Sequence, residues 1–298
     1  MSYSPPYLQK GDLVLIIGTA RARNEAAIEP ALKTLIDWGL VPIPGKNLYK
    51  QFHQFAGTDK ERARDLHWAI KHSKAKAVLI AGGGYGTLRI IDAVDFTNLK
   101  QHPKWFIGYS DTTVLHARLQ KLGSACIHGT MAFQFHKNKE ATESIKKLLF
   151  GEKINYQIPI HPLNKKGEAT AEIIGGNLSL IYALSGSVDD LQTKTKILFI
   201  EDLDEQLYHI DRMMLQLKRS GKLKALKGLV VGGMSDMKDN AIPFGKNAEE
   251  IILDAVKEYD YPVCFNFPAG HIDKNLALFF GKKVNLKVEK NKVHFNYV

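Results

Sequence analysis

The alternation of strand and helix in this chain is clearest in Lys104-Trp-Phe-Ile-Gly-Tyr-Ser-Asp-Thr-Thr-Val-Leu-His-Ala-Arg-Leu119. The apolar run from Trp105 to Ile107 suits a buried parallel strand, and the apolar residues of 114–119 recur at helical spacing. Ser110 stands at the corner, where a side chain projects over the carboxyl end of the strand, beside the first free N–H groups of the helix. The stretch therefore predicts a strand, a sharp turn and a helix, with one serine at the turn.

This turn allows two interpretations of the serine. A hydrolase nucleophile is held on such a strand-to-helix turn, and Gly108 permits the tight approach that the turn requires. The full hydrolase signature has a second glycine two residues after the serine, where this chain has Thr112, so the match is partial. In the other interpretation Ser110 or Asp111 is simply the N-cap of the helix, a role that both residue types fill well.

The same alternation extends over the first half of the chain. Apolar stretches predict strands at residues 12–17, 40–43, 77–81, 105–107 and 125–127. Helices are expected between them, and Thr58 with Glu61 forms a capping box at the start of one. This order predicts the α/β class, with an open, mostly parallel sheet in an N-terminal domain of residues 1–150.

The second half of the chain has a more mixed pattern. Residues 151–170 are rich in turn-forming and charged residues, which predicts a linker. Residues 171–298 predict a smaller, mixed α/β domain. Its expected helices follow Asn177 and cover residues 210–217 and 248–256, and its expected strands are 196–201, 228–231, 263–265, 277–280, 284–288 and 293–297.

Composition narrows the possible partners. The 298 residues are 45% hydrophobic with a net charge of +10, which suits a globular protein able to bury a real core. The lysines are spread along the chain without a basic block, which argues against nucleic-acid binding, although a basic field can attract a substrate that carries carboxylates. Cys126 and Cys264 stand far apart, and no metal-ligand spacing is found, so neither disulfides nor a metal are expected.

The N-terminus and the hydropathy pattern bear on location. The first seven residues contain neither a charged region nor an apolar core of a signal peptide, and no window approaches the length of a membrane span. We therefore expect a cytoplasmic protein that does not contact a membrane.

A glycine cluster, Gly82-Gly-Gly-Tyr-Gly86, follows the strand at 77–81 and precedes an expected helix over residues 88–91. Such a loop exposes backbone N–H groups, but it fits neither of the two common nucleotide-binding glycine motifs. Three interpretations remain open: a phosphate cradle in a non-catalytic binding module, an oxyanion hole formed with the N–H of Asp111, or a structural tight turn.

A nucleophilic serine needs a base, and the base needs an orienting acid. Glu201 ends an apolar strand at the sheet edge where sites gather, although Asp202 and the acidic residues that follow also suit a solvated acidic loop. His271 lies in a Gly/Pro loop from which a side chain can reach a cleft. His128, which follows another strand, is the rival candidate for the base.

Five short motifs occur together and in one order along nearly the whole chain: Gly83–Gly86, Gly108–Thr113, Gly175–Leu178, the strand ending at Glu201, and Gly270-His271 with Asn275. In this order they resemble the LD-carboxypeptidase family of serine peptidases. The resemblance implies Ser110 as nucleophile, Glu201 as acid and His271 as base, with the backbone of Gly84 and Asp111 as oxyanion hole. It also implies two domains that share the site, a homodimer, and no metal or cofactor.

The resemblance implies a substrate as well. It is a murein tetrapeptide, cleaved at the amide between an L-configured diamino-acid centre and terminal D-alanine during recycling of cell-wall peptides. Other members are immunity-type peptidases that hydrolyse peptidyl-nucleotide antibiotics, for which Tyr182 and Tyr208 would be the available aromatic platform. The side chains or backbone expected to contact substrate are Gly83, Tyr85, Gly176 and Asn177.

One departure from the family pattern concerns substrate contacts. Members often have an arginine directly before Gly-Gly-Tyr-Gly, and here Gly82 occupies that place. A terminal carboxylate favours an arginine fork or backbone amides, and the sequence leaves Arg89, Arg212 and Lys274 open for this role.

Overall fold

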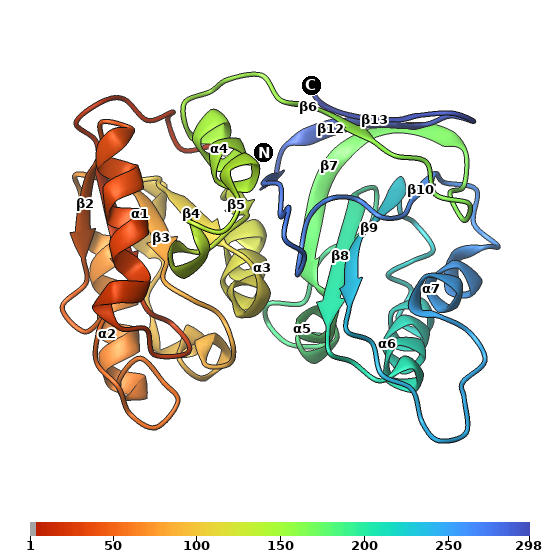
Figure 1. Cartoon of the computed structure of the whole chain (residues 1–298), viewed down its shortest axis with the longest axis horizontal. Coiled ribbons are helices and arrows are strands. Elements are labelled where there is room, and N and C mark those ends of the chain that lie inside the picture. The colour runs from red at the N-terminus through yellow and green to blue at the C-terminus, as the bar shows by residue number, and fades with distance from the viewer. Residues whose placement is uncertain (1–3) are drawn as a thin grey trace. The chain divides into compact units, whose positions relative to one another are not determined.

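The computed structural model describes residues 4–298, which form two compact units. Unit 1 contains the described residues up to Lys153 with Asp273–Phe279, and unit 2 contains Ile154–Ile272 with Phe280–Val298. Each unit has its own sheet with flanking helices, which confirms the predicted α/β class (Figure 1). Residues 1–3, part of the N-terminal stretch used to predict the location, lie outside the described residues.

Unit 1 is built on a six-stranded sheet in the order β11-β5-β4-β3-β1-β2. Its strands are β1 (Leu13–Ile17), β2 (Val41–Pro44), β3 (Ala75–Ile80), β4 (Trp105–Gly108), β5 (Cys126–His128) and β11 (Leu278–Phe280). The pairs among β1 to β5 are parallel. The central strands are buried because helices cover both faces, which explains their continuous apolar runs.

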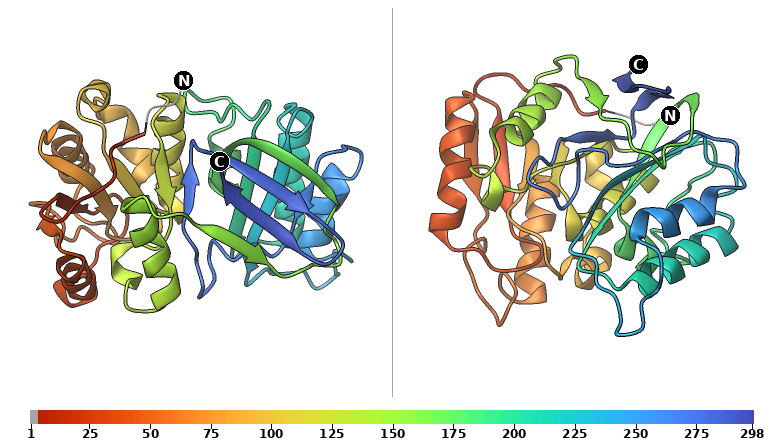
Figure 2. Two further views of the ribbon diagram at one scale, coloured as in Figure 1. Left: turned by 90° about the horizontal axis from the view of Figure 1, so that it is seen from above. Right: turned by 45° about the vertical axis from the view of Figure 1, so that its right-hand side comes forward.

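The α-helices of unit 1 alternate with its strands along the chain. They are α1 (Glu25–Asp37), α2 (Asp59–Lys71), α3 (Thr113–Lys121) and α4 (Lys139–Leu149). Helix α1 lies on one face of the sheet, and α2 lies on the other (Figure 2). The predicted capping box of α2 is confirmed, since Thr58 and Glu61 bond each other's backbone N–H groups.

Short 3₁₀ turns replace one expected helix. The segment around residues 88–91 forms two 3₁₀ turns, Thr87–Arg89 and Ile91–Ala93, instead of an α-helix. The other 3₁₀ turns of unit 1 are Thr97–Lys100, Ser110–Thr112 and Ala132–Gln134.

Unit 2 has a seven-stranded sheet in the order β10-β9-β8-β7-β12-β13-β6. Its strands are β6 (Asn155–Ile158), β7 (Gly167–Asn177), β8 (Ile197–Leu203), β9 (Gly228–Ser235), β10 (Val263–Cys264), β12 (Lys283–Val288) and β13 (Val293–Tyr297). The helices are α5 (Leu178–Ala183), α6 (Leu207–Arg219) and α7 (Ala248–Val256). Strand β7 joins two patterns, because its first half pairs antiparallel with β12 and its second half pairs parallel with β8.

Three features of the chain differ from the sequence expectations. Strand β7 was not predicted, and residues 151–170 contain β6 and the start of β7. Strand β11 was expected with the C-terminal strands but pairs in the sheet of unit 1.

Among residues 4–298, every helix is too short or too polar to cross a lipid bilayer.

Candidate active site

Ser110 lies on a strained turn of unit 1, directly after β4. Its φ is +60°, in the left-handed region that residues other than glycine rarely adopt. The N-cap residue of α3 is Thr112, and no side chain caps this helix, so neither Ser110 nor Asp111 is its cap. Strain of this kind is typical of a serine that is held exposed on a strand-to-helix turn.

The partial hydrolase signature has a local explanation. A methyl group at Gly108 would lie 2.6 Å from Oγ1 of Thr112, so the threonine side chain occupies the space above the first glycine. The turn thus accommodates Thr112, where the signature has its second glycine, because Gly108 has no side chain.

The glycine loop is packed against the serine. A methyl at Gly83 would lie 3.1 Å from Oγ of Ser110. Gly84 has a φ of +107°, and its N–H has no hydrogen-bond acceptor among residues 4–298. The structure therefore brings together the loop and the turn that were expected to form the oxyanion hole.

A buried carboxylate joins this loop to the turn. The N–H of Thr87 donates a 2.8 Å hydrogen bond to Oδ2 of Asp111. Burial raises the pKa of the Asp111 carboxyl, and the hydrogen bonds with Thr87 oppose that shift. Asp111 directly follows Ser110 in the chain. Its carboxylate thus holds the end of the glycine loop against the serine turn.

Glu201 and His271 meet in unit 2. Nδ1 of His271 lies 2.6 Å from Oε2 of Glu201, and the backbone N–H of His271 donates to the same oxygen at 3.1 Å. Glu201 is completely buried in β8, so the interpretation of this residue as part of a solvated acidic loop is wrong. With the proton on Nδ1, the neutral ring presents Nε2 as its acceptor.

Backbone contacts fix the histidine loop. Gly270 has a φ of +102°, and a methyl there would lie 2.7 Å from atoms of Glu201. Oγ of Ser235 donates a 2.6 Å hydrogen bond to the carbonyl of His271. Only glycine can precede the histidine without displacing the carboxylate.

Electrostatics favour the cationic form of the imidazole. Burial lowers the pKa of His271, but the charge and hydrogen bond of Glu201, with a contribution from Asp202, raise it by more, so the net shift is upward. Burial, together with repulsion from Glu201, raises the pKa of Asp202 to about 7. Asp202 accepts hydrogen bonds from Nδ2 of Asn177 and from the N–H of Ser179, so it anchors the start of α5.

The other expected residues have different surroundings. His128 is completely buried in β5, with its ring edge-on to Tyr109. Tyr85 is exposed, and the backbone of Gly176 lies in β7 opposite Ile200 of β8. The side-chain oxygen of Asn177 caps α5, as its position in the sequence predicts.

The three side chains considered for a terminal carboxylate are engaged elsewhere. Arg89 forms a bidentate pair with Asp59, and Lys274 pairs with Glu140. Arg212 lies over the ring of Tyr208 in unit 2.

Sequence reasoning missed Arg21 and Arg23. Both stand between β1 and α1, at the carboxyl edge of the sheet where Ser110 also lies. Two arginines directly after an apolar strand were the signal that could have found them.

No group of three or more His, Cys, Asp or Glu residues that could hold a metal ion occurs in the part of the chain that the structure describes.

Comparisons with known proteins point to one family. Residues 14–129 match the LD-carboxypeptidase N-terminal domain, and residues 170–286 match the LD-carboxypeptidase C-terminal domain. A probable murein peptide carboxypeptidase of Bacillus subtilis is 36% identical over 294 residues, which cover 95% of this chain and 91% of the relative. A murein tetrapeptide carboxypeptidase of Pseudomonas aeruginosa is 26% identical, with 92% of each chain covered.

Solved structures show the same fold. The muramoyltetrapeptide carboxypeptidase from Oxalobacter formigenes has a TM-score of 0.87 at 25% identity, covering 96% of this chain and 98% of its own. An MccF-like protein from Bacillus anthracis has a TM-score of 0.86 at 22% identity, with 100% of both chains covered. The two domain matches together span most of the sequence and contain Ser110 and Glu201 as well as His271. The chain therefore belongs to the LD-carboxypeptidase family of serine peptidases.

Proposed function

We propose that this protein is a serine carboxypeptidase that removes terminal D-alanine from murein tetrapeptides in the recycling of cell-wall peptides. The observation that carries the proposal is the 2.6 Å contact between His271 and the buried Glu201, which is the acid–base half of a Ser-His-Glu triad. The strained Ser110 beside the glycine loop supplies the nucleophile. The names of the Bacillus subtilis and Pseudomonas aeruginosa relatives support the substrate class.

The reaction begins with proton transfer from the serine. Nε2 of His271 accepts the proton of the Ser110 hydroxyl while Oγ attacks the carbonyl carbon of the scissile amide. Negative charge then develops on the carbonyl oxygen, where the N–H groups of Gly84 and Asp111 donate hydrogen bonds. Glu201 keeps the imidazole in the required tautomer and stabilises the imidazolium.

The intermediate collapses when the carbon–nitrogen bond breaks. The imidazolium of His271 gives its proton to the leaving nitrogen, so D-alanine departs as an amine and the tripeptide remains as an ester on Ser110. Water, deprotonated by His271, attacks this ester. The tripeptide leaves with a new carboxylate, and the proton returns to Ser110.

Substrate cleavage tests the proposal. The purified protein is incubated with murein tetrapeptide, and released D-alanine and tripeptide are quantified. Ser110→Ala and His271→Ala should each reduce kcat on the order of 10⁴- to 10⁶-fold, with poor additivity, because the triad acts as a unit. Ser124→Ala, a buried serine elsewhere in unit 1, is the matched control and should retain turnover. Near-normal turnover in Ser110→Ala would contradict the assignment.

One observation favours a second candidate, an immunity-type peptidase that hydrolyses peptidyl-nucleotide antibiotics. Tyr182, Tyr208 and Arg212 line one pocket of about 720 Å³ in unit 2. The exposed ring of Tyr208 and the half-buried ring of Tyr182, beside an arginine, suit stacking of a nucleobase. A peptidyl-nucleotide analogue, assayed beside the tetrapeptide, separates the two: preferential cleavage of the analogue, reduced in Tyr208→Ala, would favour this candidate.

The proposal includes a homodimer in the cytoplasm. Both expectations come from the family resemblance and the sequence. Sedimentation at micromolar concentration should give twice the mass of one chain, and a single-chain mass would remove the dimer from the proposal.

A further inference from the structure

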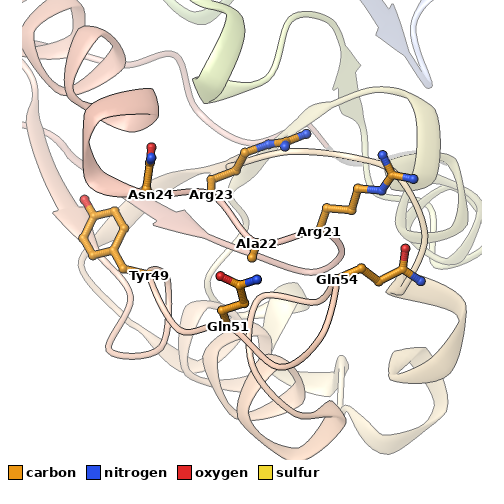
Figure 3. Close-up of a pocket in the computed structure, with 7 residues that line it drawn as sticks. All are labelled: Arg21, Ala22, Arg23, Asn24, Tyr49, Gln51 and Gln54. Carbon is orange, nitrogen blue, oxygen red and sulfur yellow. The ribbon is translucent and has the colours of Figure 1, made fainter.

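An open pocket of about 500 Å³ lies at the carboxyl edge of the sheet in unit 1. The residues that line it come from the segments after β1 and β2 and are mostly polar: Arg21, Ala22, Arg23, Asn24, Tyr49, Gln51 and Gln54 (Figure 3). Arg21 and Gln54 extend in the same direction on one side of the pocket, and Tyr49 and Asn24 lie on the other (Figure 3). The pocket is therefore rich in hydrogen-bond donors.

The two arginines lie against the glycine loop. A methyl at Gly82 would lie 2.6 Å from Nε of Arg23, and one at Gly84 would lie 2.6 Å from the Arg21 side chain. The N–H of Arg21 also donates to the carbonyl of Gly83 at 3.2 Å. Because Gly83 in turn contacts Ser110, the arginines and the serine are separated by the thickness of one backbone loop.

Among the described residues, the two arginines of this pocket have no paired carboxylate, although burial and, less strongly, the charge of Glu25 raise the pKa of Tyr49 on the other side of the pocket. Within residues 4–298, neither Arg21 nor Arg23 forms an ion pair with a carboxylate. Burial and the neighbouring Arg21 lower the pKa of Arg23, against a smaller effect of Tyr109. Nε of Arg23 is buried without a hydrogen-bond partner among these residues, and its guanidinium lies 4.1 Å from the centre of the Phe133 ring.

Other arginines of unit 1, unlike Arg21 and Arg23, form ion pairs with carboxylates. Arg62 and Arg89 both pair with Asp59, and Arg118 pairs with Asp92. Two adjacent guanidinium groups without a counter-ion repel each other, and an anion placed between them would remove this cost. The pocket also opens at the start of α1, where the helix dipole favours negative charge.

The substrate limits where its terminal carboxylate can lie. In a peptide, the terminal carboxylate carbon is separated from the scissile carbonyl carbon by bonds that span about 4 Å at most. The carboxylate therefore stays near the glycine loop, which contacts Ser110 through Gly83 and the two arginines through Gly82 and Gly84. Guanidinium groups bind a carboxylate through paired hydrogen bonds, which lysine cannot reproduce.

We propose that Arg21 and Arg23 bind the terminal carboxylate of the departing D-amino acid. The inference rests on the proposed carboxypeptidase function and deepens it, because it explains why cleavage is restricted to the last residue of the peptide. Arg21 and Arg23 are then specificity-determining residues for the reaction at Ser110.

The test compares two substrates that differ only at this group, the murein tetrapeptide and its C-terminal carboxamide. The wild-type protein should cleave the acid with a kcat/KM at least about 10-fold higher than that for the amide. Arg23→Gln should reduce kcat/KM for the acid about 10- to 100-fold, and Arg21→Gln should act in the same direction, while the amide is affected little. Arg23→Lys should recover part of the loss.

A matched control and a binding measurement complete the design. Arg64→Gln removes an exposed arginine of α2 and should leave both substrates unchanged. In a Ser110→Ala background, calorimetric titration should show weaker binding of the acid, and unchanged binding of the amide, when Arg23 is also replaced by Gln. Equal losses for acid and amide would overturn the proposal.

The diamino acid of the substrate can carry a second carboxylate on its side chain. A tetrapeptide with lysine at that position lacks this group, so it separates binding of the side-chain carboxylate from binding of the terminal one. If the effect of Arg23→Gln persists with the lysine substrate and vanishes with the carboxamide, the terminal carboxylate is the ligand. The reverse pattern would overturn this assignment. If the wild-type protein releases no D-alanine, the proposed function itself fails, an outcome distinct from cleavage that is insensitive to Arg21 and Arg23.

Discussion

The proton chemistry at the residue scale depends on one carboxylate. Glu201 is buried against Nδ1 of His271. Burial lowers the pKa of the imidazole, but the charge and hydrogen bond of Glu201, with a smaller contribution from Asp202, together raise it by more. In the proposed mechanism the neutral ring is the active base. An upward shift of its pKa therefore means that the base forms at a higher pH than for an ordinary histidine, near 6.5.

The pH profile should report this shift. In the wild-type protein kcat/KM should rise with pH to a midpoint above about 6.5. In Glu201→Gln the neutral amide no longer raises the pKa of His271, while burial still lowers it, so the midpoint should move to lower pH and kcat should fall. Profiles from pH 5 to 9 measure both effects.

Asp202→Asn is the control for the pH experiment. Asp202 contributes less than Glu201 to the pKa of His271, so its replacement should move the midpoint less. A flat wild-type profile, or equal midpoints in the wild type and Glu201→Gln, would contradict the role of the pair.

Gly270 provides a steric test at the same scale. A methyl there would lie 2.7 Å from Glu201, at a φ of +102°. Gly270→Ala should displace the carboxylate or the loop and reduce kcat on the order of 100-fold or more, with a loss of stability of about 1–3 kcal/mol. Activity assays and thermal unfolding measure the two effects.

Gly186→Ala is the control that separates the effect of backbone strain from the effect of the steric clash at Gly270. Gly186 has a φ of +80°, but a methyl there would meet no heavy atom within 4 Å. This variant should lose some stability from backbone strain and keep its activity. Full activity in Gly270→Ala would show that the contact with Glu201 is not required.

The motifs identified two residues that lie together in the structure. Glu201 and His271 stand 70 positions apart along the chain, yet Nδ1 of His271 lies 2.6 Å from Oε2 of Glu201. Their catalytic roles stay predictions. Arg21 and Arg23 were missed because their significance depends on contacts with Gly82 and Gly84, which spacing along the chain does not reveal. Arg89 was considered instead, but its pairing with Asp59 is equally invisible in the sequence.

At the scale of elements, a hydrogen bond joins the glycine loop to the serine turn. The Asp111 carboxylate accepts the N–H of Thr87, the first residue of the 3₁₀ turn that follows the loop. This link connects the carboxyl ends of β3 and β4. It therefore supports the position of the Gly84 N–H relative to Ser110.

Asp111→Ala should loosen that arrangement. We expect kcat to fall about 10- to 100-fold with little change in KM, and stability to fall by about 1–3 kcal/mol, because the N–H of Thr87 loses its partner. Asp111→Asn retains an acceptor oxygen and should recover part of kcat. Asp92→Asn, an exposed carboxylate in the same unit, is the control. Unchanged kcat in Asp111→Ala would contradict the positioning role.

The predictability of elements followed the continuity of their apolar pattern. Strands β8 and β9 begin with unbroken buried runs and were expected close to their observed positions. Strand β7 was missed because its antiparallel half alternates exposed and half-buried positions and its parallel half contains Gly175 and Gly176, so that no single period marks it. Strand β11 was expected, but the sequence pattern contains no information about which sheet accepts it.

At the scale of the whole molecule, the proposed catalytic groups are divided between the two units. Ser110 and the glycine loop belong to unit 1, and the Glu201–His271 pair belongs to unit 2. The chain returns to unit 1 at Asp273, two residues after His271. The proposed chemistry therefore requires the whole chain, because neither unit contains all three triad residues.

Labelling by a fluorophosphonate probe, read by mass spectrometry, tests the central claim most directly. A serine reacts with this probe when a base activates it, so the account predicts one modified residue, Ser110, and a strong loss of labelling in His271→Ala. Labelling of another residue, or labelling of Ser110 that is unchanged in His271→Ala, would contradict it. So would an unlabelled protein that binds a phosphorylated metabolite tightly, the behaviour expected of a non-catalytic module.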